Sequence, residues 1–282
     1  MIQTVSQLPE LRERIAQWKR AGEHIGFVPT MGNLHAGHLA LVRQARANAD
    51  RVVTSIFVNP TQFGPNEDFA QYPRTIEADT ERLDAGGCDL LWLPSVATMY
   101  PFGAEATVRI SVPGLSDSLE GVHRPGHLDG VATVVARLLN QVQADVAVFG
   151  CKDYQQLAVV RYLVRDLAFP VEIIGAPTMR EADGLAMSSR NQYLTPAQRP
   201  AAAAIFECLR WMRAAVQEGV ACAEVEASAA ERLQAAGFVL DYAVVRRRDL
   251  GLPAERERGD LVALVAVRLG RTRLIDNLEF EA

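Results

Sequence analysis

The segment IGFVPTMGNLHAGH, from Ile25 to His38, decides the fold of this chain. It begins with an apolar run of the length of a buried strand, Pro29 ends that run, and a helical pattern resumes at Leu39. His35 and His38 therefore lie at or near the start of a helix, on one face of it. A helix start favours anions, because it presents backbone N–H groups and the positive end of the helix dipole. The segment is typical of a strand, turn and helix that bind a phosphate group.

The same two histidines could also belong to a zinc site. None of the four cysteines pairs in a Cys-x-x-Cys motif, and the other histidines show no ligand spacing, which argues against zinc. Gly32 and Gly37 have no Cβ, so a phosphate or an adenine ring could approach the backbone closely at both points. The pattern therefore favours phosphate chemistry.

Size and composition limit the class of protein. The chain has 282 residues, of which 49% are hydrophobic and 22% charged, as in a globular protein with a sizeable core. This length favours two domains. The net charge of −5 provides no basic field, which argues against extended nucleic-acid binding.

The sequence points to a cytoplasmic protein without a membrane segment. No apolar run approaches the roughly 20 residues needed to cross a bilayer. The first 20 residues contain acidic residues and an early proline, unlike a signal peptide. The four scattered cysteines form no disulfide framework, which favours a reducing compartment.

Short apolar runs alternate with helical patterns over the first two thirds of the chain. We predict strands at 25–28, 52–58, 90–93, 146–149 and 171–174, and helices near 39–49, 76–85, 131–143 and 155–167. Continuously apolar strands separated by helices predict an α/β fold with a parallel sheet that has helices on both faces. Ligands of such sheets bind beyond the carboxyl ends of the strands. The motifs PTMG, NPTQF, GCKD and PTMRE each follow a predicted strand.

The last third of the chain has a different pattern. Alanine-rich helices are predicted at 196–215 and 223–236, followed by two antiparallel strands at 238–245 and 261–269. The charged segment 246–259 between them is typical of a solvated turn. These elements predict a smaller C-terminal α+β domain. We place the boundary between residues 185 and 186.

Several segments, in order along the chain, resemble the pantoate–β-alanine ligase (pantothenate synthetase) family of the nucleotidylyltransferase superfamily with the HxGH motif. They are PTMGNLHAGH (29–38), SIFVNPTQF (55–63), YPRT (72–75), RPGHLDGVATVV (124–135), KDYQQL (152–157), DGLAMSSRNQYL (183–194) and LIDN (274–277). The resemblance covers essentially the whole chain. It implies a Rossmann-like domain, residues 1–185, that binds ATP and pantoate, and a smaller lid domain, residues 186–282.

The resemblance also implies the residues of the ATP site. His38 would act as general acid or as an equivalent donor in the transition state, and His35 and Lys152 would be the other catalytic residues. The ATP-binding residues would be Met31, Gly32, Asn33, Leu34, His35, Ala36, Gly37, His38, Gly150, Cys151, Lys152, Asp153, Met179, Met187, Ser188, Ser189 and Arg190. Without the neighbouring motifs, Ser188 and Ser189 would be read as an ordinary N-cap and turn pair. Cys151 departs from the family, which usually has glutamate in GEKD.

Further residues match the acid-substrate and metal positions of the family. Gln62 and Gln156 correspond to its pantoate-binding glutamines, and amides suit a polyhydroxy acid because they bind carboxylate and hydroxyl groups without adding charge. Asn59 is a predicted secondary contact of the substrate, and Arg124 a predicted secondary contact of a phosphate or carboxylate group. Asp79 corresponds to an acidic position linked to Mg²⁺, although its spacing alone indicates only a polar helix residue.

The resemblance implies a homodimeric ligase that uses ATP and Mg²⁺ to join (R)-pantoate to β-alanine through a pantoyl-adenylate. The formation of such an adenylate depends on positioning and on neutralisation of phosphate charge. Two alternatives stay open from the residues. One is another HxGH nucleotidylyltransferase with a different acceptor, and the other is a non-catalytic ATP-binding sensor.

Overall fold

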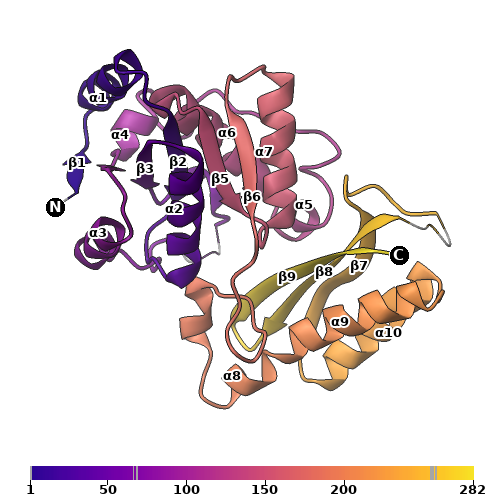
Figure 1. The fold of residues 1–282 in the computed structure, drawn as a ribbon. Helices are drawn as coiled ribbons and strands as arrows, with labels where there is room; N and C mark the ends of the chain where they lie inside the picture. The colour runs from indigo at the N-terminus through magenta and orange to yellow at the C-terminus, as the bar shows by residue number, and fades with distance from the viewer. Residues whose placement is uncertain (1, 66, 68, 255–256, 258) are drawn as a thin grey trace. The chain divides into compact units, whose positions relative to one another are not determined.

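The computed structural model of the chain describes residues 2–65, 67, 69–254, 257 and 259–282, which divide into two compact units (Figure 1). The first consists of Met1–Cys151 and Gln155–Pro177, and the second of Lys152–Tyr154 and Thr178–Ala282. The division after Pro177 falls a few residues before the predicted boundary at 185/186, because Leu185 packs in the core of the second unit. None of the helices in the described residues is long and apolar enough to cross a membrane.

The first unit is built on a six-stranded sheet with the order β1-β4-β3-β2-β5-β6, and all of its strand pairs are parallel. The strands are β1 (Gln3–Val5), β2 (Ile25–Thr30), β3 (Arg51–Ile56), β4 (Leu90–Trp92), β5 (Val146–Gly150) and β6 (Glu172–Ala176). The helices are α1 (Leu8–Arg20), α2 (Ala36–Asn48), α3 (Ile76–Ala85), α4 (Val96–Met99), α5 (Glu120–His123), α6 (His127–Val142) and α7 (Tyr154–Asp166), with a 3₁₀ turn η1 (Pro60–Gln62). The predicted parallel α/β fold is confirmed.

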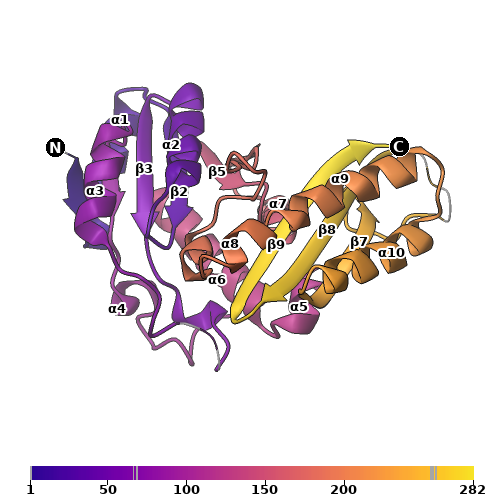
Figure 2. The same ribbon diagram turned by 90° about the horizontal axis from the view of Figure 1, so that it is seen from below.

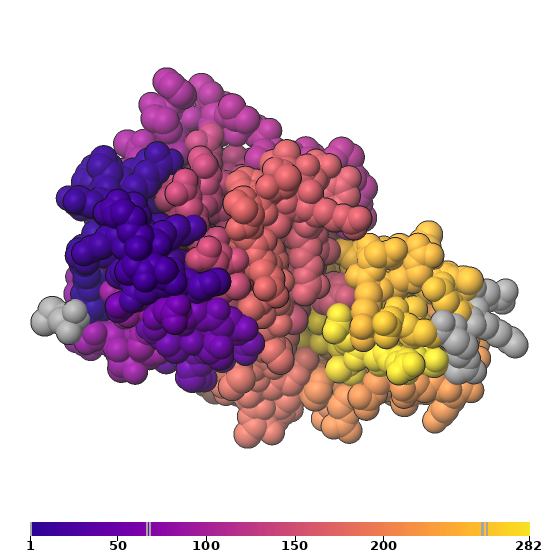
Figure 3. Space-filling model, turned by 45° about the horizontal axis from the view of Figure 1, so that its top comes forward, coloured from indigo at the N-terminus to yellow at the C-terminus, as the bar shows by residue number. Residues whose placement is uncertain are grey.

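Helices cover both faces of this sheet. Phe27 and Val53 point into a core formed with α1, α6 and α7, whereas their neighbours Val28 and Val52 point into a second core with α2 and α3. This alternation follows from the two-residue period of a strand. Figure 3 shows that, on the face in view, side chains fill the space between the elements of the first unit. The strands are buried on both sides, which is why their sequences are continuously apolar.

The strand order reverses beside β2, which determines where a ligand can bind. The chain runs from β2 outward through β3 and β4, then crosses to β5 and continues to β6 on the other side. In open parallel sheets such a switch point forms a crevice at the carboxyl ends of the strands. The loop that follows β2 contains Met31 and His35, and β5 ends at Gly150, so predicted site residues of this unit lie at that edge.

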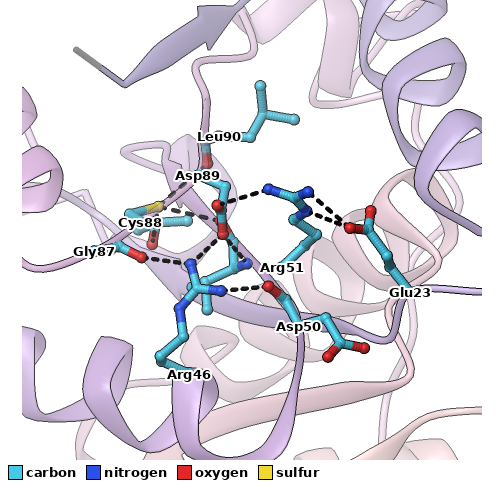
Figure 4. A network of polar contacts seen from close by, with 10 residues as sticks. Glu23, Arg46, Asp50, Arg51, Gly87, Cys88, Asp89 and Leu90 are labelled. Atoms are coloured by element: carbon cyan, nitrogen blue, oxygen red, sulfur yellow. Dashed lines mark hydrogen bonds and ion pairs between the residues drawn. The ribbon is translucent and has the colours of Figure 1, made fainter. Parts of the chain in front are cut away.

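A network of charges lies at the amino ends of the strands, opposite the carboxyl ends (Figure 4). Nη2 of Arg51 lies 2.7 Å from Oε1 of Glu23, and Nη1 of Arg51 lies 3.4 Å from Oδ1 of Asp89. Oδ2 of Asp89 accepts from the backbone N–H of Val52 at 2.7 Å and from Arg46. The network joins the starts of β3 and β4, away from the predicted site, and therefore has a structural role.

The second unit is a three-stranded antiparallel sheet, in the order β7-β8-β9, with two helices packed against it (Figure 2). Its elements are a 3₁₀ turn η2 (Ser189–Tyr193), α8 (Gln198–Ala201), α9 (Ala204–Gln217), α10 (Cys222–Ala235), β7 (Val239–Arg247), β8 (Asp260–Leu269) and β9 (Thr272–Glu281). The predicted α+β composition is confirmed. The prediction of a single helix at 196–215 is wrong, because the helix is interrupted between α8 and α9. Hydrogen bonds there join residues three apart, as in a 3₁₀ helix, such as the bond from the N–H of Ala203 to the carbonyl of Pro200 at 3.2 Å.

Candidate active site

The two histidines predicted at the helix start cap helix α2 with each other. His35 precedes the helix, and its Nδ1 accepts a hydrogen bond from the backbone N–H of Gly37 at 3.1 Å. Nδ1 of His38 accepts in turn from the backbone N–H of His35 at 3.2 Å. The centroids of the two rings are 4.1 Å apart. The helix start predicted at these residues is confirmed.

This cap fixes the tautomer of both rings. A neutral imidazole has one N–H donor and one acceptor nitrogen. Because Nδ1 of each ring accepts, the proton of each neutral ring is on Nε2. Nε2–H is then the donor that each ring can direct to a phosphate oxygen. The backbone N–H groups of His35 and Gly37, which were expected to face an anion, are instead used by the cap.

Side chains also hold the loop between β2 and α2. The N–H of Gly32 donates to Oγ1 of Thr30 at 3.2 Å. The N–H groups of Asn33 and Leu34 donate to the two carboxylate oxygens of Asp79, each at 2.8 Å. Asn33 has a φ of 52°, in the left-handed region that asparagine tolerates better than most residues. These hydrogen bonds within the first unit hold the loop in a defined conformation.

Asp79, the predicted Mg²⁺ ligand, is fully buried in the first turn of α3. Besides the loop N–H groups, it accepts a hydrogen bond from Oγ1 of Thr75 at 3.0 Å, and Nη1 of Arg82 lies 3.9 Å from its Oδ1. A cation at this carboxylate would meet these positively polarised donors, so the arrangement suits anchoring of the loop rather than Mg²⁺ binding. Within the described residues, no group of three or more His, Cys, Asp or Glu could hold a metal ion.

Asn59 and Gln62 form the turn that follows β3. Nδ2 of Asn59 donates to Oε1 of Gln62 at 3.1 Å, and Oδ1 of Asn59 accepts from the Tyr100 hydroxyl at 2.6 Å. Nε2 of Gln62 donates to Sδ of Met31 at 3.2 Å. Both amide side chains are buried. The structure thus brings two predicted pantoate residues next to a predicted ATP residue within the first unit.

Helix α6 packs directly against this turn at Gly130. A Cβ added to Gly130 would lie 2.4 Å from the carbonyl oxygen of Thr61 and 2.7 Å from Cα of Gln62, so only glycine fits. The carbonyl of Gly130 also accepts from Nδ2 of Asn59 at 3.2 Å. The close approach explains the second glycine of the segment RPGHLDGVATVV, Gly130, which had no role assigned from the sequence.

Arg124, predicted to contact the substrate, is engaged in an ion pair in the structure. Its Nε and Nη2 donate to the two carboxylate oxygens of Glu67 at 2.6 and 2.7 Å. Its Nη1 donates to Nε2 of His127 at 2.9 Å, since arginine cannot accept. Nδ1–H of His127 then donates to the backbone carbonyl of Gln62 at 2.9 Å. Arg124 therefore supports, through His127, the turn that contains Gln62. A direct contact of Arg124 with substrate stays a prediction.

The charge states of His127 and Glu67 follow from burial and from the positive charge of Arg124. Burial lowers the pKa of His127 to about 4, and the positive charge of Arg124 acts in the same direction. Burial would raise the pKa of Glu67, but the hydrogen bond and charge of Arg124 outweigh it, so that this pKa lies below its ordinary value. At neutral pH the three groups are a carboxylate, a guanidinium and a neutral imidazole.

Gln156, the second predicted pantoate glutamine, lies in the first turn of α7 beside Gln155. Gln155 is buried, and its Nε2 donates to the carbonyls of Leu115 at 2.6 Å and Ser118 at 2.8 Å. Gln156 is half-buried, and within the described residues its side chain makes no hydrogen bond. Gln155 therefore holds a loop, whereas the amide of Gln156 remains for a ligand.

The predicted phosphate loop Gly150–Asp153 begins as a continuation of β5. The N–H of Cys151 donates to the carbonyl of Ala176 at 2.8 Å, so this N–H belongs to the sheet. Cys151 itself is partly buried against the core of the first unit. Lys152 follows, with its Nζ 3.6 Å from Oδ1 of Asp153.

The remaining predicted ATP residues form a short hairpin and turn in the second unit. The N–H of Met187 donates to the carbonyl of Met179 at 2.9 Å. Ser188 precedes η2, and its Oγ accepts from the N–H of Arg190 at 3.2 Å. Ser188 is therefore an N-cap, which was the alternative interpretation of this residue. Ser189 is the first residue of η2.

Several residues that contact the predicted site had no role assigned from the sequence, His127 and Asn277 among them. His127 lies in the segment RPGHLDGVATVV and Asn277 in LIDN, so both were in recognised motifs without an assigned role. Their partners are 65 and 125 residues away in the chain. Only their polar type within a matching motif could have marked them.

The comparisons with known proteins each match nearly the whole chain and point to the same family. The family model for Pantoate-beta-alanine ligase matches residues 3–279. Pantothenate synthetases of Xylella fastidiosa (strain M12) and Xanthomonas euvesicatoria pv. vesicatoria (strain 85-10) are 63% and 61% identical over 281 and 280 residues, covering 99% of this chain and 100% of each relative.

Solved structures give the same result. Pantothenate synthetase from Thermus thermophilus superposes with a TM-score of 0.92 at 48% identity, over 98% of this chain and 99% of that chain. Pantoate-beta-alanine ligase from Francisella tularensis, described as complexed with "Beta-gamma ATP and Beta-alanine", gives a TM-score of 0.83 at 32% identity, over 99% and 97% of the two chains. The chain therefore belongs to the Pantoate-beta-alanine ligase family.

Proposed function

We propose that this chain condenses (R)-pantoate with β-alanine to pantothenate, using ATP and releasing AMP and pyrophosphate. The observation that carries the proposal is the mutual cap of His35 and His38. It fixes two imidazoles as Nε2–H donors in the same unit in which Gln62 contacts Met31. The ATP compound and β-alanine bound by the Francisella tularensis relative support the same substrates.

The first step is the transfer of an adenylyl group to pantoate. A carboxylate oxygen of pantoate attacks the α-phosphorus of ATP, the bond from that phosphorus to the bridging oxygen breaks, and pyrophosphate leaves. Negative charge develops on the leaving group, so preorganised donors lower the barrier. We assign Nε2–H of His38 to the general acid or hydrogen-bond donor role, with His35 and Lys152 as further donors. Gln62 and Gln156 would hold the acid substrate, and Asn59 would keep Gln62 in place.

The second step forms the amide bond. The amine of β-alanine attacks the acyl carbon of the pantoyl-adenylate, the bond from that carbon to the phosphate oxygen breaks, and AMP leaves. The amine loses a proton as the new C–N bond forms. Exclusion of water matters here, because water would hydrolyse the adenylate. We propose that residues 186–282 act as a lid for this reason.

Mg²⁺ is proposed to enter with ATP, bound mainly by phosphate oxygens, as this ion usually is in nucleotide enzymes. The hydrogen bonds of Asp79 argue against a direct contact with the metal. Met187, Ser188, Ser189 and Arg190 are proposed to contact the nucleotide from the second unit. Homodimerisation and a cytoplasmic location are also part of this proposal and derive from the family resemblance.

The test is AMP release that requires both pantoate and β-alanine, measured by a coupled assay with purified protein. His38→Ala should lower the rate of pyrophosphate release by about 10²- to 10⁴-fold, the usual contribution of a general acid. His38→Gln is the matched control, because a glutamine oxygen can accept the N–H of His35 and keep the cap. We expect only His38→Ala to lose stability. His38→Gln should lose activity if His38 acts as a general acid, because an amide cannot release a proton, and should keep part of it if a hydrogen-bond donor is sufficient.

Other outcomes identify the alternatives. Pyrophosphate release that ignores pantoate but needs another acceptor would indicate a different HxGH nucleotidylyltransferase. ATP binding without any pyrophosphate release would indicate a sensor. A folded His38→Ala protein with near wild-type turnover would refute the role of His38.

A further inference from the structure

Two neighbouring residues of strand β9, Asp276 and Asn277, hold separate segments of the predicted ATP site. Both are buried, with 4% and 6% exposure, although the ends of charged and amide side chains usually reach solvent. Successive residues of a strand point to opposite faces of the sheet. The two side chains therefore act on different parts of the second unit.

Asn277 bonds the backbone of the predicted catalytic lysine. Its Nδ2 donates to the carbonyl oxygen of Lys152 at 2.8 Å. Glu279, two residues further on and therefore on the same face of the strand, accepts from the hydroxyl of Tyr154 at 2.8 Å. The face of β9 that bears Asn277 thus holds the segment Lys152–Tyr154, which belongs to the same compact unit.

Asp276 holds the hairpin that carries Met179 and Met187. Nη1 and Nη2 of Arg180 donate to its two oxygens at 2.6 and 3.1 Å. Arg180 lies between the predicted contact Met179 and the hairpin turn, where its Nη1 also donates to the carbonyl of Gly184 at 3.1 Å. The guanidinium is stacked on a ring, with its Cζ 3.8 Å from the centroid of Phe206.

The two halves of this arrangement are joined to each other. Oδ1 of Asp276 accepts from the N–H of Asn277 at 2.8 Å, and Nη2 of Arg180 donates to the carbonyl of Asn277 at 3.1 Å. A buried carboxylate is tolerated when it is paired and hydrogen-bonded, and this one accepts from Arg180 and from the N–H of Asn277. A shift of the hairpin would therefore be transmitted to Asn277 and to the carbonyl of Lys152.

We propose that Asp276 and Asn277 are positioning residues for adenylate formation, Asn277 by fixing the backbone of Lys152 and Asp276 by fixing the hairpin through Arg180. The proposal rests on the proposed function of Lys152 as a donor to the phosphates. A donor that acts on developing charge must be preorganised, and a small displacement of such a group has a large effect on the rate. Neither residue needs to touch a substrate for this role.

The first experiment measures pyrophosphate release and the KM values of Asn277→Ala. We expect kcat to fall by about 10- to 100-fold, with the KM for pantoate unchanged, because only the position of Lys152 is affected. Asn277→Asp keeps the size of the side chain but removes the donor, so it should show the same loss of kcat. It replaces the alanine variant if that protein does not fold. Glu281→Ala, at the exposed end of β9, is the matched control and should retain wild-type kcat.

The second experiment separates positioning from a general structural role. If Asn277 acts through Lys152, the double variant Lys152→Ala/Asn277→Ala should be no slower than Lys152→Ala alone. The proposal would be overturned if the double variant lost kcat by the product of the two single losses. This result counts only if Asn277→Ala and the double variant unfold at the same temperature as the wild type. Equal kcat for Asn277→Ala and the wild type would overturn it too.

A third measurement keeps the proposal testable if the wild type shows no adenylation, which would refute the proposed function. Calorimetric titration with ATP then replaces turnover. Asn277→Ala and Lys152→Ala should weaken ATP binding by the same factor, and the double variant by no more. Asp276→Asn, which removes the charge that pairs with Arg180, should also weaken ATP binding. Unchanged ATP affinity in all these variants would overturn the positioning role by itself.

Discussion

The contacts of His127 predict a specific loss of stability on acidification. Its ring is neutral in the folded chain, with Nε2 accepting from Arg124 and Nδ1–H donating to Gln62. Its pKa is about 4 in the folded protein, against an ordinary value of 6.5 in the unfolded chain. Below pH 6.5 the unfolded chain therefore binds a proton that the folded protein does not. Stability from this residue is complete above pH 6.5 and is lost between pH 6.5 and 4.

The size of the effect follows from the difference in pKa. Each unit is worth about 1.36 kcal/mol, so about 2 kcal/mol is lost by pH 5 and about 3 kcal/mol by pH 4. The carboxylate of Glu67 contributes in the same direction but only near and below its ordinary pKa of 4.5. The interval from pH 7 to pH 5 therefore separates the contribution of His127 from that of Glu67.

The assay is denaturant unfolding at several pH values, for the wild type and for His127→Gln. Glutamine offers N–H donors and a carbonyl acceptor but no titrating group. Between pH 7 and pH 5 the wild type should lose about 2 kcal/mol more of its free energy of unfolding than His127→Gln. His24→Gln, at an exposed position of the same unit, is the control and should follow the wild type. Equal pH dependence in the wild type and His127→Gln would refute the argument.

Further predictions concern three residues of the site, Gln156, Gln62 and Cys151. Gln156→Ala should raise the KM for pantoate by roughly 10- to 100-fold and leave that for ATP unchanged, because a hydrogen bond to a charged group is worth about 1.5 to 3 kcal/mol. Gln62→Ala should raise both constants, since it also removes the contact with Met31, and a purely ATP-related effect of either variant would mean that the subsites are reversed. Cys151→Glu should change the KM for ATP by less than about threefold, the range of a weak electrostatic contact. Rapid alkylation of Cys151 that ATP prevents would instead place its thiol at the nucleotide.

The strands of the first unit could be predicted because they are buried on both faces. Their sequences are continuous apolar runs, and β2 to β6 were found within a few residues of their ends. The short strand β1 has two exposed residues and no apolar run, so it was missed. Strand β9 was recognised only as the motif LIDN, because Asp276 and Asn277 interrupt its alternation. Both polar residues have hydrogen-bond partners far away in the sequence, Arg180 for Asp276 and Lys152 for Asn277, so no local pattern could predict them.

The candidate site shows the same limit. The placement of His35 and His38 at a helix start could be predicted, because capping depends on residues close in sequence. The ion pair of Arg124 with Glu67 joins residues 57 positions apart, and sequence analysis assigned this arginine to the substrate instead. For Asp79 the sequence indicated an acid near the nucleotide loop but not the N–H groups that occupy its oxygens.

The mutual cap of His35 and His38 also explains why the two histidines of the HxGH motif are three residues apart. This is the distance from an N-cap residue to the third residue of a helix, so the spacing is set by the geometry of the first helical turn and not by the shape of a substrate. An insertion or deletion between them would remove the hydrogen bond from the N–H of His35 to Nδ1 of His38. The motif is therefore a folding signal as well as a chemical one.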